Sequence, residues 1–181
     1  AGDFSFRDVP IAFETRMQPL SDGKSQSMRF VATSGNAELE LTGRVMQAGA
    51  FNGRMKLSAE KASEVGETLW ALIDDRGPSI MPEEPLFIDV RVDRTVGKID
   101  LQSRRVQLGE SEGNLELLIL GQGTRRFTGT LGLGQLNLDL WHFEDARSSE
   151  KAVDGIPPWS ENLAGNFTVT AEALTWHDQL V

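Results

Sequence analysis

Cysteine and tyrosine are absent from the 181 residues, and histidine occurs only twice. Without cysteine the chain forms no disulfide, thiol nucleophile or cysteine-ligated metal site, although this absence does not identify a compartment. No run approaches the roughly 18 continuous apolar residues of a membrane-spanning helix. Basic residues are in deficit, with 18 Lys and Arg against 27 Asp and Glu and a net charge of −9. Because such a field repels phosphate backbones, we expect no nucleic-acid partner.

Residues for catalysis are equally scarce. Both histidines directly follow a tryptophan, as Trp141-His142 and Trp176-His177. Such a pair is typical of a strand end, where the indole enters the core and the imidazole faces solvent. The acidic residues around His142 lack the spacing of a metal site, and no glycine-rich loop leads into a helix to bind phosphate. We therefore expect no enzyme, no cofactor and no metal.

Most of the chain alternates apolar and polar residues with a period of two, which predicts β-strands with one buried face. In residues 38–45, Leu39, Leu41 and Val45 alternate with polar residues. The same alternation predicts strands at residues 51–57, 86–92, 127–140 and 163–173, and weaker ones at 4–15 and 28–33. Residues 115–120 are almost continuously apolar, which favours a strand covered on both faces. The sequence thus predicts a mainly β fold with antiparallel strands.

One segment follows a helical period instead. Between residues 59 and 74, apolar side chains such as Val65, Leu69 and Leu72 recur at helical spacing, with Ser58 as a possible N-cap. The pattern predicts one amphipathic helix that covers part of the sheet or plugs its open end. Residues 75–85 and 144–161 are polar and proline-bearing, which predicts loops. No shift in composition marks a boundary, so residues 1–181 are predicted to form a single β-rich domain.

Four glycines share a local pattern, apolar-x-Gly-x-apolar, centred on Gly43, Gly53, Gly129 and Gly165. Each glycine occupies an apolar-facing position of its predicted strand. A glycine there marks strong coiling of the sheet or the close approach of another group. Two interpretations stay open: the glycines serve curvature alone, or they widen a groove for an apolar ligand.

A fixed order of motifs runs through the middle of the chain. A glycine-bearing strand precedes the predicted helix, a proline-bearing loop and a further strand follow, and a strand pair and a closing strand come last. The motifs are Phe51-Asn52-Gly53-Arg54-Met55, residues 59–74, residues 86–92, Leu108-Gly109-Glu110-Ser111 and Leu136-Asn137-Leu138-Asp139-Leu140. In this order, residues 40–141 resemble the central β-rich region of the AsmA-like proteins of the Gram-negative envelope, and residues 163–176 resemble it more faintly.

The resemblance implies a fold, a function and a location. The fold would be a strongly coiled antiparallel sheet that forms an open groove, or half-pipe, with an apolar inner face. The groove would bind phospholipid acyl chains, contributing to phospholipid transport between the inner and outer membranes or to outer-membrane assembly. The chain would be a fragment of a longer periplasmic protein, anchored to the inner membrane by a segment outside this sequence and in contact with other envelope proteins.

The acyl-chain-binding residues would then be apolar-facing residues of the predicted strands. They are Leu39, Leu41, Phe51, Met55, Leu57, Ile88, Val90, Leu117, Phe127, Leu131 and Leu138.

Two other hypotheses fit the same patterns. The chain could be a structural or scaffolding module whose apolar core is closed and takes no ligand. It could also be a small barrel of the allene-oxide-cyclase or dirigent kind that binds an apolar substrate. Closure of the sheet separates the barrel from the groove, because a barrel has no free edge and a groove leaves an edge strand exposed.

Overall fold

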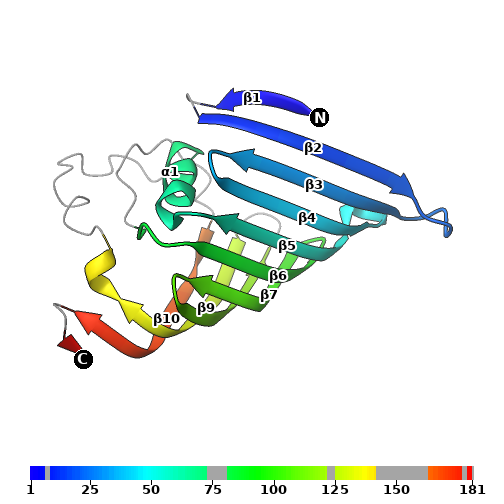
Figure 1. Ribbon diagram of the computed structural model, residues 1–181. Coiled ribbons are helices and arrows are strands. Elements are labelled where there is room, and N and C mark those ends of the chain that lie inside the picture. Colours follow the sequence, from blue (N-terminus) through cyan, green and yellow to red (C-terminus); the bar gives the residue numbers. More distant parts are fainter. Residues whose placement is uncertain (7–8, 73–80, 122–124, 142–162, 177–178, 181) are drawn as a thin grey trace.

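The strands form one sheet of eleven strands whose order follows the chain (Figure 1). The computed structural model describes residues 1–6, 9–72, 81–121, 125–141, 163–176 and 179–180. The strands are β1 (Gly2–Phe6), β2 (Val9–Pro19), β3 (Gln26–Ser34), β4 (Ala37–Val45), β5 (Phe51–Ala59), β6 (Leu86–Thr95), β7 (Lys98–Leu108), β8 (Ser111–Leu120), β9 (Arg125–Asn137), β10 (Leu163–Trp176) and β11 (Gln179–Leu180). The described helices are α1 (Ala62–Leu72) and two 3-10 helices, η1 (Gln47–Gly49) and η2 (Leu138–Leu140). The predicted mainly β class with one amphipathic helix is confirmed.

The sheet is open. β1 and β11 lie at its opposite edges, and among the described residues β1 pairs only with β2 and β11 only with β10. The prediction of an open, coiled sheet is confirmed, and the allene-oxide-cyclase or dirigent-like barrel is wrong for the described strands. Figure 1 shows the sheet curving, so that β9 and β10 turn under the strands that precede them.

Short connections explain most of the strand order. β3–β4, β6–β7 and β7–β8 are joined by two residues each, and these connections contain Gly35, Gly97 and Gly109. All three glycines have positive φ, between +56° and +74°, which only a residue without a Cβ adopts at little cost. The sequence therefore specifies tight antiparallel hairpins at these places.

One strand pair departs from the expected antiparallel pattern. β9 and β10 run parallel, with Leu163 opposite Arg125 and Val169 opposite Leu131, whereas the nine other pairs are antiparallel. A parallel pair needs a crossover of a dozen or more residues. The long connection formed by residues 138–162 meets that requirement, so the chain returns to the beginning of β9 before β10 starts.

The helix starts later than predicted. β5 continues through Ser58 and Ala59, which pair with Phe87 and Leu86 of β6, so Ser58 is not the N-cap and α1 begins at Ala62. The first helical N–H groups donate to the segment before β6 instead: Ala62 N–H to the Glu84 carbonyl at 2.7 Å, and Ser63 N–H to the Pro82 carbonyl at 3.0 Å. These bonds satisfy donors that the helix itself leaves unpaired. The predicted helix end at residue 74 lies outside the described residues.

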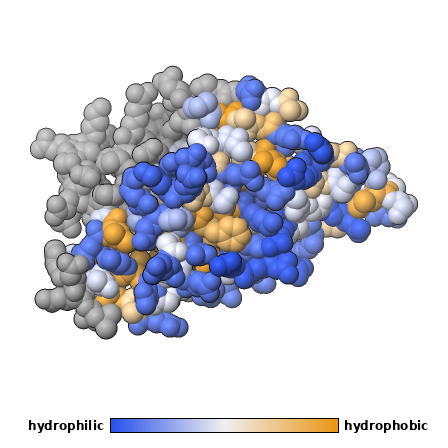
Figure 2. Space-filling model, viewed as in Figure 1, coloured by the Kyte–Doolittle hydropathy of each residue, from blue (hydrophilic) through white to orange (hydrophobic). Residues whose placement is uncertain are grey.

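The register divides the sheet into two faces. Residues paired across strands share a face, so Leu41, Met55 and Val90 form one row, and Glu40, Lys56 and Asp89 form a row on the other side. We call these the apolar face and the polar face. Figure 2 shows the polar face, on which hydrophilic residues predominate. The helix packs on the apolar face, where Ala62 and Val65 contact Ala59, Leu86 and Leu108.

Two local predictions are wrong. The apolar run at residues 115–120 is not covered on both faces, because Leu118 and Leu120 lie on the polar face and Leu120 is 45% exposed. The strand predicted to continue through Leu140 ends at Asn137. The Asn137 side chain accepts the Asp139 N–H at 3.0 Å, which caps η2 and turns the chain out of the strand direction.

Candidate functional site: an apolar cavity on one face of the sheet

A cavity of about 420 Å³ lies on the apolar face, within the range of small-molecule binding pockets. It is bounded by β6 to β10, by the segment before β6 and by the turn after β9. All thirteen of the described residues that line it are hydrophobic. They are Met81, Leu86, Ile88, Val106, Leu108, Leu115, Leu131, Leu133, Leu136, Leu138, Trp141, Phe167 and Val169. An apolar cavity of this size can hold a hydrocarbon chain but offers no group to orient a polar substrate.

Strand register brings these side chains together. Ile88 of β6 is opposite Val106 of β7, and Leu115 of β8 is opposite Leu131 of β9. Because β10 runs parallel to β9, Val169 stands beside Leu131 on the same face. Five neighbouring strands therefore contribute one continuous wall.

The wall is buried on one side and open on the other. Leu86 and Leu133 are only 6% and 4% exposed, whereas Phe167 and Val169 on β10 are 47% and 51% exposed. Large exposed apolar side chains beside a cavity are typical of a binding site for an apolar partner. The β10 side is thus the accessible side of the cavity.

Every predicted strand residue of the groove lies on the apolar face. The register places Leu39, Leu41, Phe51, Met55, Leu57, Ile88, Val90, Leu117, Phe127 and Leu131 there, and Leu138 lies in η2. Only Ile88, Leu131 and Leu138 of this set line the cavity. The other eight belong to the same face at other positions along the sheet.

Phe51 and Val90 form core rather than an accessible lining. Val90 has no exposed surface and Phe51 is 7% exposed, and both pack with Val92. Partly buried side chains, including Met28 and Leu101, cover this cluster. Phe51 and Val90 are therefore buried in this conformation, and their predicted contact with a ligand stays a prediction.

The strand glycines make room for rings of the same chain. Gly43 and Gly53 are paired, and the Phe51 ring lies over both: its Cζ atom is 2.7 Å from the position of a Cβ on Gly43 and 2.5 Å from that on Gly53. Gly129 is covered in the same way by the Phe167 ring, at 2.5 Å. These glycines permit a close approach, and the space above them is filled by aromatic rings instead of widening a groove.

Several cavity residues were not predicted. Val106, Leu108 and Leu133 follow the period-two pattern, so the sequence carries a usable signal for them, whereas Leu115 begins the almost continuously apolar run. Phe167 and Val169 reach the cavity only because β10 is parallel to β9, and the sequence pattern does not reveal strand direction across a long connection.

The remaining chemistry is sparse. Within the part of the chain that the structure describes, no three His, Asp or Glu side chains converge on a possible metal position. His142 and His177, considered above as tryptophan neighbours, lie outside the described residues. None of the described helices is both long and apolar enough to cross a lipid bilayer.

The fold defines a mainly β half-pipe with an apolar cavity on one face. Comparison of the chain with protein-family models, with curated proteins and with solved structures found no significant match.

Proposed function

We propose that this chain is a binding module for acyl chains or similarly apolar ligands, held on the apolar face of its open sheet. The main support is the cavity of about 420 Å³, because the thirteen described residues that line it are all hydrophobic. The half-exposed Phe167 and Val169 at its β10 side provide an entry for a ligand from solvent.

The expected affinity follows from burial of methylene groups. Each buried CH₂ contributes about 0.8 kcal/mol, so ten methylenes contribute about 8 kcal/mol. Loss of translational and rotational freedom and ordering of the chain oppose this gain. We therefore expect a dissociation constant no tighter than roughly micromolar for a single acyl chain. Binding should depend little on salt, because none of the described residues that line the cavity is charged.

The biological role extends the same proposal. With the resemblance to AsmA-like proteins, an acyl-chain groove fits a contribution to phospholipid transport between the inner and outer membranes, or to outer-membrane assembly, in the periplasm. The proposal assigns no catalysis to this module. The phospholipid is the proposed ligand, and other envelope proteins are the proposed partners.

A cavity-filling variant tests the proposal. In Val169→Trp an indole enters the cavity from a half-exposed position, so the core is little disturbed. Thr168→Trp is the matched control. Thr168 directly precedes Val169 on β10, and its side chain lies on the polar face, away from the cavity. Native mass spectrometry and calorimetric titration with a single-chain lysophospholipid measure occupancy in the wild type and both variants.

The wild type and Thr168→Trp should bind the lipid equally, and Val169→Trp should bind at least tenfold more weakly. Circular dichroism and a urea titration establish that each variant is folded. If the folded wild type takes up no lipid, the scaffold hypothesis with a closed core replaces the proposal. Equal binding by Val169→Trp and the wild type would place the ligand elsewhere and would also contradict it.

A further inference from the structure

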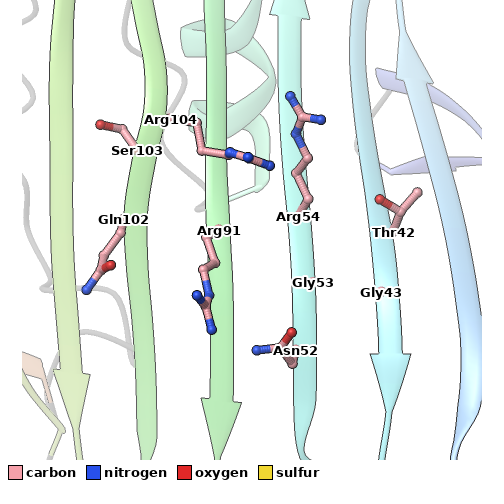
Figure 3. A pocket seen from close by; sticks show the side chains of 9 residues that line it. All are labelled: Thr42, Gly43, Asn52, Gly53, Arg54, Arg91, Gln102, Ser103 and Arg104. Atoms are coloured by element: carbon pink, nitrogen blue, oxygen red, sulfur yellow. The ribbon is translucent and has the colours of Figure 1, made fainter.

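A second depression, of about 520 Å³, lies on the polar face across β4 to β7. Figure 3 shows the three arginines that line it, Arg54, Arg91 and Arg104, together with the polar side chains of Thr42, Asn52 and Gln102. None of the described residues that line it is acidic, although acidic residues outnumber basic ones by 27 to 18 in the chain. The depression is therefore a locally cationic, donor-rich place on an acidic protein.

A β-bulge directs one of these arginines into the site. On β7, Ser103 pairs with Val90 and Arg105 pairs with Asp89, so Arg104 has no partner on β6. The preceding residue, Ser103, is held by the neighbouring strand β8, because its Oγ accepts the Leu115 N–H at 2.8 Å. Bulges redirect the side chain of the inserted residue. Figure 3 shows the consequence: Arg104 extends across β6 toward Arg54 on β5.

The arginine side chains of the site outnumber the carboxylates that pair with them. Asp89, whose side chain is 5% exposed, accepts two hydrogen bonds from Arg54. Asp93 accepts from Arg91 Nε at 2.7 Å and also from Asn52. Arg104 makes no hydrogen bond or ion pair with the described residues beyond its long-range attraction to Asp89. Among the described residues, Glu40 also attracts Arg54 but is itself paired with Arg29 and Lys56. Arg104 therefore keeps a positive charge and N–H donors that no described carboxylate pairs with.

We propose that this depression binds an oxyanion of the phosphate class, held between the guanidinium groups of Arg104 and Arg54 with Arg91 at its edge. Planar guanidinium forks match the geometry of phosphate oxygens, and charge-assisted hydrogen bonds are the strong ones. An anion between Arg54 and Arg104 would offset two like charges, of which Asp89 pairs with only one, that of Arg54. The site is on the face opposite the apolar cavity, so this inference stands independently of the proposed function.

Two sources could supply such a group: a free phosphate compound or the headgroup of an anionic lipid. The first arm of the test is a ³¹P NMR titration of the chain with inorganic phosphate at constant ionic strength. The second arm is co-sedimentation with vesicles of phosphatidylcholine alone and of phosphatidylcholine with phosphatidic acid. Each arm uses the wild type and the variants Arg104→Gln, Arg104→Lys and Arg29→Gln. Arg29 is the control, because it lies on the same face and is paired with Glu40 at 2.8 Å.

Arg104→Gln should weaken binding at least tenfold, Arg104→Lys should give an intermediate loss because it keeps the charge without the fork, and Arg29→Gln should bind like the wild type. Arg104 is exposed on the bulge, so its replacement leaves the core intact, which a urea titration checks. Dependence on Arg104 in the phosphate arm identifies a free phosphate compound, and dependence in the vesicle arm alone identifies a headgroup. No binding in either arm, or equal losses for Arg104→Gln and Arg29→Gln, would overturn the proposal.

Discussion

Adding one methyl group at Gly53 should cost more stability than the same change at Gly129 or Gly134, two other strand glycines. A Cβ there would lie 2.5 Å from Cζ of the Phe51 ring and closer still to the backbone carbonyl oxygen of Thr42. Real Cβ atoms do not approach other heavy atoms so closely. The ring is 7% exposed and the carbonyl belongs to the neighbouring strand, so neither moves without disturbing the pairing of β4 with β5.

The size of the effect follows from these surroundings. Overpacking a core costs about 1–3 kcal/mol, and displacing a buried phenylalanine costs up to about 3–5 kcal/mol. For Gly53→Ala we expect a loss of about 2–4 kcal/mol in the free energy of unfolding. For Gly129→Ala we expect about 1 kcal/mol, because the obstructing ring belongs to Phe167, which is 47% exposed and can rotate away.

Gly134→Ala is the matched control. It also lies in a strand, its φ is not positive, and the nearest atom to an added Cβ is the Glu112 carbonyl oxygen at 3.5 Å. There the alanine should be neutral or stabilising by up to about 1 kcal/mol, because it restricts the unfolded chain. Urea unfolding of the three variants measures the order. Equal losses of stability at Gly53 and Gly134 would refute the argument that the Phe51 ring and the Thr42 carbonyl require a glycine at position 53.

Two further predictions concern polar contacts of the sheet. Hydrogen bonding from Arg54 lowers the pKa of Asp89, so the stabilisation by its ionised form is complete above its unfolded pKa of about 3.9 and is lost as the pH falls toward the lower folded pKa. Asp89→Asn should therefore lower the free energy of unfolding by about 1–3 kcal/mol at neutral pH. Urea titrations should find that this difference between variant and wild type shrinks below about pH 4. A constant difference down to pH 2 would contradict the ion pair. Ser103→Ala should cost about 1–2 kcal/mol, because it leaves the Leu115 N–H without its acceptor, and amide exchange at Leu115 should accelerate; unchanged exchange would show that the bond does not protect this amide.

The alternation of residues predicted the strands and their faces well, because burial of one face imposes it residue by residue. Leu39, Leu41 and Met55 lie on the apolar face as the pattern requires. The helix boundary was less predictable. Ser58 suits an N-cap by its residue type, but pairing of Ala59 with Leu86 extends the strand, and this tertiary contact has no local signal.

The cavity depends on which strands become neighbours, and this is why only part of it was predictable. Ile88 and Leu131 were identified from their own strands. Val169 reaches the cavity because residues 138–162 carry the chain back to run parallel with β9, and no local pattern fixes that direction. Arg104 illustrates the same limit, since the bulge that directs its side chain is a property of the β6–β7 register.

The proposed function requires that an acyl chain occupies the cavity between β6 and β10. Photocrosslinking tests it most directly: the folded chain is incubated with a lysophospholipid that carries a diazirine on its acyl chain, irradiated, and mapped by peptide mass spectrometry. We expect adducts on cavity residues, above all Leu133, Phe167 and Val169, and their loss in Val169→Trp. Adducts confined to the polar face, or spread without preference over the surface, would contradict it.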